Sequence, residues 1–167
     1  MSEKALVVID LQNDITKNYR DIIGSVNEAI DWAERNSIAV VYVKHNNLTP
    51  KTRTFKPGTR GVELVPEMRV VSDNVFVKTK GNALTSEGFF AFLRENGIRE
   101  CFLAGADATA CVKSTSYNMA KEGYEVTVLS DCITSYDKGK IDGMIRYYVS
   151  KGCAVKTIGE IIRRADA

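Results

Sequence analysis

A cysteine near the start of a predicted helix is the strongest candidate for covalent chemistry in this sequence. Cys111 lies in the segment AGADATACVKSTSYNMA, where a strand pattern ends at Gly105 and a helix pattern begins near Ala110. A thiol in the first turn of a helix lies beside unpaired amides and the positive end of the helix dipole, which lower its pKa. The same amides can bind the oxyanion that forms when a thiolate attacks a carbonyl. Position alone also fits a buried, inert cysteine.

A cysteine nucleophile needs a base, and the sequence offers two candidates. The usual base is histidine, and the only one is His45, directly after the second predicted strand. Nothing in the sequence places it beside Cys111. The other candidate base is Asp10, which ends the first predicted strand. Lys78 ends the third predicted strand in the same way. Because the carboxyl ends of parallel strands meet at one edge of a sheet, we expect Asp10, Lys78 and the turn before Cys111 to converge there.

The elements that must position these residues alternate along the chain. Strands are predicted over residues 5–9, 38–44, 74–78, 101–105, 124–131 and about 153–156, and helices over about 19–35, 85–96, 110–122, 138–150 and from 158 onward. Apolar strands that alternate with helices favour a parallel sheet covered on both faces. With right-handed crossovers, we expect an α/β fold: a three-layer α/β/α, doubly wound, Rossmann-like sheet of about six strands. One domain over residues 1–167 accommodates all of it.

Residues 45–73 are predicted to form a long loop between the second and third strands. They show no clear period and contain all three prolines, Pro50, Pro57 and Pro66. A loop of this length in a compact domain is usually functional or mobile. We expect it to help shape the pocket.

Composition excludes several classes of protein. Hydrophobic residues make up 44% and charged residues 26% of the 167 residues, which is ordinary for a globular domain. The net charge of +2 gives no electrostatic reason to expect nucleic acid or an anionic membrane as a partner. No apolar run approaches the roughly 20 residues of a membrane helix, and the N-terminus lacks a secretory signal. We therefore expect a cytoplasmic protein with a small-molecule substrate.

Two kinds of cofactor site are missing from the sequence. Its four cysteines, Cys101, Cys111, Cys132 and Cys153, are far apart, with no close pair of the kind that binds zinc. We expect them to be reduced thiols. Neither GxGxxG after the first strand nor GxxxxGK[ST] occurs, so no nucleotide cofactor is expected.

Three motifs, in order along the chain, resemble the isochorismatase-like cysteine hydrolase superfamily, which includes nicotinamidases and N-carbamoylsarcosine amidohydrolase. The segments are ALVVIDLQND, NVFVKTKGNAL and AGADATACVKSTSYNMAKEGYEVTVLSD, and GTRGVELVPEM also resembles the family's approach to the lysine strand. The resemblance implies a catalytic triad of Asp10, Lys78 and Cys111. It also implies an oxyanion hole formed by the amides of Asp107 and Cys111, and a cis peptide bond between Ala106 and Asp107.

The resemblance implies an amidohydrolase that cleaves a small carboxamide, ureido or related C–N bond through a thioester on Cys111. Gln12, Asn82 and His45 are candidates for substrate binding. Asp107 stands where a small or neutral residue is usual, and we expect its carboxylate to point away from the oxyanion or to contact a cationic substrate. Many relatives are oligomers, so a homo-oligomer is expected by analogy.

Some activities in the family fit this chain less well. Nicotinamidases carry a metal site of one aspartate and two histidines, which a chain with a single histidine cannot assemble, so no metal is expected. Isochorismate offers the thiol no acyl carbon to attack, although an isochorismatase-type hydrolase stays an alternative. Two further alternatives are a catalytically idle binding member of the same fold and a redox protein that uses Cys111, for which the sequence shows no resolving partner.

Overall fold

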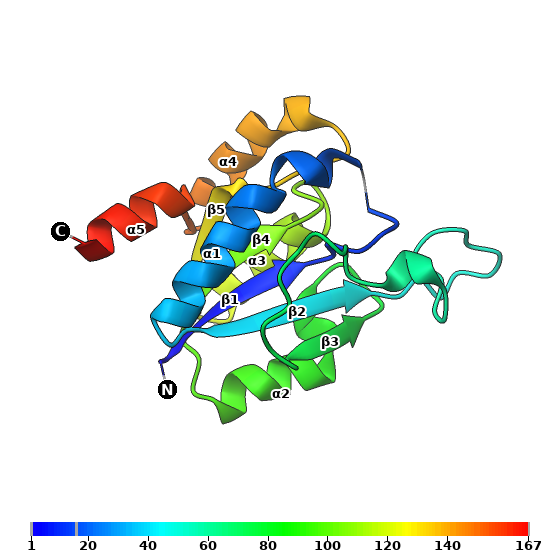
Figure 1. Cartoon of the computed structure of the whole chain (residues 1–167), viewed down its shortest axis with the longest axis horizontal. Helices are drawn as coiled ribbons and strands as arrows, with labels where there is room; N and C mark the ends of the chain where they lie inside the picture. The colour runs from blue at the N-terminus through cyan, green and yellow to red at the C-terminus, as the bar shows by residue number, and fades with distance from the viewer. Residues whose placement is uncertain (1, 16, 167) are drawn as a thin grey trace.

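The computed structural model describes residues 2–15 and 17–166, which form a six-stranded sheet (Figure 1). The strands are β1 (Lys4–Ile9), β2 (Ala39–His45), β3 (Val75–Lys78), β4 (Glu100–Gly105), β5 (Glu125–Ile133) and β6 (Ala154–Lys156). Their order across the sheet is β3-β2-β1-β4-β5-β6, and every neighbouring pair is parallel. The predicted doubly wound parallel sheet is confirmed.

Five α-helices and four short 3-10 turns connect the strands in the described residues. The helices are α1 (Ile23–Arg35), α2 (Glu87–Glu95), α3 (Cys111–Lys121), α4 (Ile141–Ser150) and α5 (Ile158–Asp166). The turns are η1 (Lys17–Asp21), η2 (Arg60–Val62), η3 (Ala83–Thr85) and η4 (Lys138–Lys140). Three helices begin later than predicted because a separate 3-10 turn takes up their expected first residues, as is common at helix starts. None of the described helices is long and apolar enough to pass through a bilayer.

The helices cover both faces of the sheet, and the continuous apolar run of β1 explains why. Leu6 and Val8 belong to the core that α1 and α5 complete. Ala5, Val7 and Ile9 belong to the second core, which contains side chains of α2, α3 and α4. Successive side chains of a strand point to opposite faces, so a strand buried on both faces must be apolar throughout.

The strand order reverses beside β1, whose neighbours are β2 and β4. At the carboxyl ends of β1 and β4, Ile9 is paired with Gly105. Gly105 has a φ of 115°, and a Cβ atom there would lie 2.0 Å from the Ile9 carbonyl oxygen, so only glycine fits. From this close approach the chain turns through Ala106 and enters α3 with Cys111 as the first helical residue.

The predicted loop of residues 45–73 extends beyond the carboxyl end of β2 and contains η2 (Figure 1). Three consecutive side chains after β1 hold its backbone. The Gln12 side-chain amide donates to the Val62 carbonyl at 2.9 Å, and that of Asn13 donates to the Arg60 carbonyl at 2.7 Å. The Asp14 carboxylate accepts from the Phe55 amide at 2.7 Å. The loop is therefore fastened beside the carboxyl edge of the sheet.

Candidate active site

The ammonium group of Lys78 lies at the centre of the cluster that the strand ends bring together. Its Nζ atom donates to Asp10 Oδ2 at 3.1 Å and to Cys111 Sγ at 3.2 Å, and it lies 2.9 Å from His45 Nδ1. Lys78 is 1% exposed and Asp10 is 2% exposed. The structure shows the predicted convergence of Asp10, Lys78 and the turn before Cys111 at one edge of the sheet.

Asp10 leaves β1 in the left-handed region, with a φ of 55°. Its amide is bonded to the Val43 carbonyl at 2.9 Å, which fixes this strained turn against β2. Lys78 engages Oδ2, while Oδ1 is buried and has no hydrogen-bond partner among the described residues. Burial raises the pKa of the Asp10 carboxyl, and this outweighs the opposite effect of the Lys78 charge. The carboxyl group is thus poised to take up a proton.

Cys111 is half-buried at the start of α3, and its environment differs from the sequence-based prediction. Burial, followed by the negative charge of Asp10, raises the pKa of the Cys111 thiol to about 12. The nearby Lys78 ammonium lowers that pKa but does not compensate. The expectation of a depressed thiol pKa was wrong, because burial and the charge of Asp10 raise the pKa more than the Lys78 ammonium lowers it. A raised pKa favours the thiol form, so the group needs a base to become a nucleophile.

Two backbone amides at the entry to α3 are available to an oxyanion. In the described part of the chain, the amides of Asp107 and Cys111 donate to no backbone or side-chain acceptor. The peptide bond between Ala106 and Asp107 is cis, as the resemblance implies. The role of these two amides as an oxyanion hole stays a prediction.

The Asp107 carboxylate accepts hydrogen bonds from its own turn and from the segment after β5. Oδ1 accepts from the Thr109 amide at 2.8 Å and from the Thr109 hydroxyl at 2.9 Å, and Oδ2 accepts from the Tyr136 amide at 2.8 Å. Burial alone would raise the pKa of Asp107, but the hydrogen bonds from Tyr136 and Thr109 prevail and lower it. Both oxygens are therefore occupied by protein donors, Oδ1 within the turn that carries the two amides and Oδ2 at Tyr136.

Two residues predicted to bind substrate form hydrogen bonds to the backbone, and for Asn82 the substrate contact stays a prediction. The Gln12 side chain is fully buried, accepts from the His45 amide at 2.7 Å and donates to the carbonyls of His45 and Val62. Its polar groups are all engaged, so its assignment to substrate binding is corrected. Asn82 Oδ1 accepts from the Leu84 amide at 2.9 Å and caps η3.

His45 is the residue whose place sequence reasoning left undetermined. It is half-buried at the end of β2, and its ring meets the Phe55 ring edge-on with centroids 5.7 Å apart. Burial, followed by the Lys78 charge, lowers the pKa of His45. In the sheet His45 is the direct partner of Lys78. The register of β2 against β3 would have predicted the contact between His45 and Lys78, but the sequence does not give this register.

The site does not fit a resident metal ion. Ligand atoms of Asp10, His45 and Cys111 all lie within 4.8 Å of one another. The Lys78 ammonium, however, lies within hydrogen-bonding distance of all three side chains, so a cation of the protein's own already occupies their midst. The set of one aspartate and two histidines is also absent, since His45 is the only histidine.

Two solved structures are similar to this chain in fold. The N-carbamoylsarcosine amidase structure from Thermoplasma acidophilum is 26% identical, with a TM-score of 0.80 over 93% of this chain and 96% of that chain. The zinc complex of the Pyrococcus horikoshii pyrazinamidase is 21% identical, with a TM-score of 0.84 over 93% and 99% of the two chains.

Sequence comparison points the same way. A probable inactive nicotinamidase of Arabidopsis thaliana is 27% identical over 153 residues, which cover 76% of this chain and 78% of that protein. The model of the isochorismatase domain matches residues 4–160. The chain therefore belongs to the isochorismatase family of hydrolases.

Proposed function

We propose that this protein is a thiol amidohydrolase that cleaves a C–N bond of a small carboxamide or ureido compound through a thioester on Cys111. The observation that carries the proposal is the Lys78 ammonium, which donates to both the Cys111 sulfur and the Asp10 carboxylate inside a buried cluster. Burying two charged groups costs free energy. Such groups therefore persist where they pair with each other or where function requires them. The likeness to an N-carbamoylsarcosine amidase supports the choice of bond.

The first half of the proposed reaction forms the thioester. Asp10 takes the proton from Cys111, and its unpartnered Oδ1 is the acceptor that Lys78 leaves free. The sulfur attacks the carbonyl carbon, and the resulting oxyanion accepts from the amides of Asp107 and Cys111. Asp10 returns its proton to the nitrogen, the C–N bond breaks, and ammonia or an amine leaves.

The second half restores the enzyme. Asp10 removes a proton from a water molecule, whose oxygen attacks the thioester carbon. The C–S bond breaks, and Cys111 regains a proton as the carboxylic acid leaves. A raised Asp10 pKa suits a group that must accept and donate a proton in each half-reaction, because proton transfer is most efficient when the pKa lies near the working pH.

The test is a screen of purified protein against small amides and ureido compounds for ammonia release. The Cys111→Ala variant is the matched control. Turnover by the wild type that disappears in the variant supports the proposal. Turnover that survives in the variant contradicts it.

A second candidate function is binding without turnover. It is favoured by the relative described as a probable inactive nicotinamidase and by the raised pKa of the Cys111 thiol. Calorimetric titration with the same panel separates the two. A compound that binds both wild type and Cys111→Ala, and that neither protein consumes, would favour the binding protein.

A further inference from the structure

We propose that His45 is a positioning residue that holds the Lys78 ammonium against Cys111 and Asp10. The inference deepens the proposed function and rests on it for its meaning, because it assigns a fourth member to the catalytic cluster. It concerns the geometry of Lys78, and it can be tested on the reactivity of the Cys111 thiol without any substrate.

The hydrogen-bonding capacity of Lys78 carries the inference. An ammonium group has three N–H donors and no acceptor. Three acceptors surround it: Asp10 Oδ2 at 3.1 Å, His45 Nδ1 at 2.9 Å and Cys111 Sγ at 3.2 Å. Without the imidazole, a lysine that is 1% exposed would keep one donor unsatisfied. A buried donor without a partner is strongly unfavourable, so the ammonium would move from its present place.

His45 is itself held firmly on several sides. The Gln12 side chain bonds both its amide and its carbonyl. Phe55 packs edge-on against the imidazole from a backbone with a φ of 53°, a conformation that bulky residues rarely adopt. The Asp14 carboxylate fixes that conformation through the Phe55 amide. A ring fixed in this way supplies Nδ1 at a defined place. A residue on a mobile loop that only contacted substrate would not do so.

The contact requires neutral imidazole with its proton on Nε2. A protonated ring carries N–H on both nitrogens and would repel the ammonium. The charged and titratable groups that face His45 are Lys78 from β3, Asp10 after β1 and Cys111 from α3. Gln12 and Phe55 are uncharged. As pH falls through the His45 pKa, which burial and Lys78 lower below the ordinary 6.5, the contact is lost.

The experiment compares two replacements of this ring. His45→Asn retains an acceptor oxygen near the position of Nδ1, whereas His45→Phe retains a ring against Phe55 but has no acceptor. The reaction of Cys111 with dithiodipyridine is followed between pH 5 and pH 9 by thiopyridone release, with the modified residue identified by mass spectrometry. The other three cysteines are buried in the folded protein.

We expect Cys111 in His45→Phe to react about tenfold more slowly at pH 8, because the variant loses one hydrogen bond to a charged group. His45→Asn should react within about twofold of the wild type. As the pH is lowered, the logarithm of the wild-type rate should decrease more steeply once His45 becomes protonated. Both variants should lack this steeper acid limb. Circular dichroism and thermal melting establish that both are folded.

An unchanged rate and pH profile in His45→Phe overturns the inference. It is also overturned if the folded His45→Asn protein reacts as slowly as His45→Phe, because an acceptor would then be irrelevant. If thiol reactivity follows the acceptor while no amide in the panel is consumed, the positioning role stands and the proposed function fails. The two failures are therefore distinguishable.

Discussion

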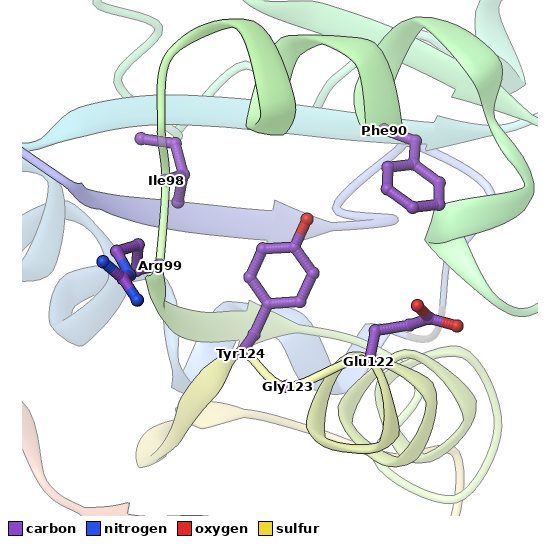
Figure 2. Close-up of a pocket in the computed structure, with 6 residues that line it drawn as sticks. All are labelled: Phe90, Ile98, Arg99, Glu122, Gly123 and Tyr124. Atoms are coloured by element: carbon purple, nitrogen blue, oxygen red, sulfur yellow. The ribbon is translucent and has the colours of Figure 1, made fainter.

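The two ends of the parallel sheet differ in the groups that they present. At the amino ends of β4 and β5, a cavity of about 260 Å³ lies between α2 and the end of α3 (Figure 2). Tyr124 lies between Ile98 and Phe90, with Arg99 and Glu122 on opposite sides of it. At the carboxyl ends, the side chains of Asp10, Lys78 and Cys111 converge within hydrogen-bonding distance of one ammonium group.

The difference teaches that the convergence of buried polar groups, and not open volume, distinguishes the carboxyl end of the sheet. The cavity at the amino end keeps its charged groups apart, where water can solvate them. The carboxyl end buries an aspartate and a lysine almost completely. Buried charges persist where pairing or function compensates their desolvation. Substitutions at the two ends should therefore have very different effects.

Replacing the proposed nucleophile gives the largest expected effect. Cys111→Ser should reduce ammonia release by on the order of 10⁴-fold or more, because a serine hydroxyl in this site has no sufficiently strong base. Turnover is measured with the best compound of the amide panel. Cys153→Ala, a buried thiol near β6, is the control and should retain activity. Equal losses in both variants would mean that the site is misassigned.

Two glycines, one at each end of the sheet, test the packing side of the comparison. Gly105→Ala should lower the free energy of unfolding by about 3 kcal/mol or more, because its Cβ atom would overlap the Ile9 carbonyl. Gly123→Ala, at a φ of 96° with nothing within 4 Å, should cost only about 1–2 kcal/mol of backbone strain. Urea denaturation measures both. Equal losses would show that close approach at the carboxyl edge is unimportant.

The buried ion pair predicts a non-additive double-mutant cycle. Asp10→Asn and Lys78→Met should each destabilise the protein by about 3 kcal/mol, because each leaves its partner unpaired in the interior. The double variant should be closer in stability to the wild type than the sum of the single losses implies. Denaturation at neutral pH supplies all four corners. Strict additivity would argue that the charges do not interact.

Asp107 predicts a pH-dependent loss of stability at the same edge. Its folded-state pKa is lowered, so the carboxylate contributes stability that is complete above 3.8, its ordinary value, and is lost as pH falls through the folded-state pKa. Asp107→Asn should therefore be less stable than the wild type by about 1 kcal/mol at pH 7. The difference should shrink below pH 3.8. Thermal melting across this range tests it, and a gap independent of pH would contradict it.

The smallest effect is expected at the cavity at the amino end. Tyr124→Phe should change the free energy of unfolding by no more than about 0.5 kcal/mol and leave turnover unaltered. The same denaturation and ammonia assays apply. A tenfold change in turnover would break the comparison, because it would tie the amino-end cavity to catalysis.

The sheet and the convergence of side chains at its carboxyl edge could be predicted because both follow from local patterns. An apolar run such as residues 5–9 forms a strand, and parallel strands bring their carboxyl ends together. This reasoning placed Asp10, Lys78 and Cys111 at one edge. The bounds of α1 and α4 were less predictable, since a 3-10 turn and a helical first turn share the same side-chain pattern.

The remaining features depend on distances that a sequence does not contain. The raised pKa of Cys111 reflects burial by residues remote in the chain and the nearness of Asp10. His45 meets Lys78 only through the register of β2 against β3. Gln12 looked like a pocket residue because it follows Asp10, yet its amide engages the backbone of a segment more than 30 residues away.

The segment between β2 and β3 is fastened in a way that bears on how this scaffold could be adapted. Gln12, Asn13 and Asp14 engage its main-chain atoms at His45, Phe55, Arg60 and Val62. Main-chain anchors survive exchange of the side chains that extend from them. A library that randomises exposed loop positions such as Leu48 and Lys51 should therefore yield many folded members with altered selectivity. In this molecule the exposed side chains of the loop can be exchanged without touching the contacts that fasten its main chain.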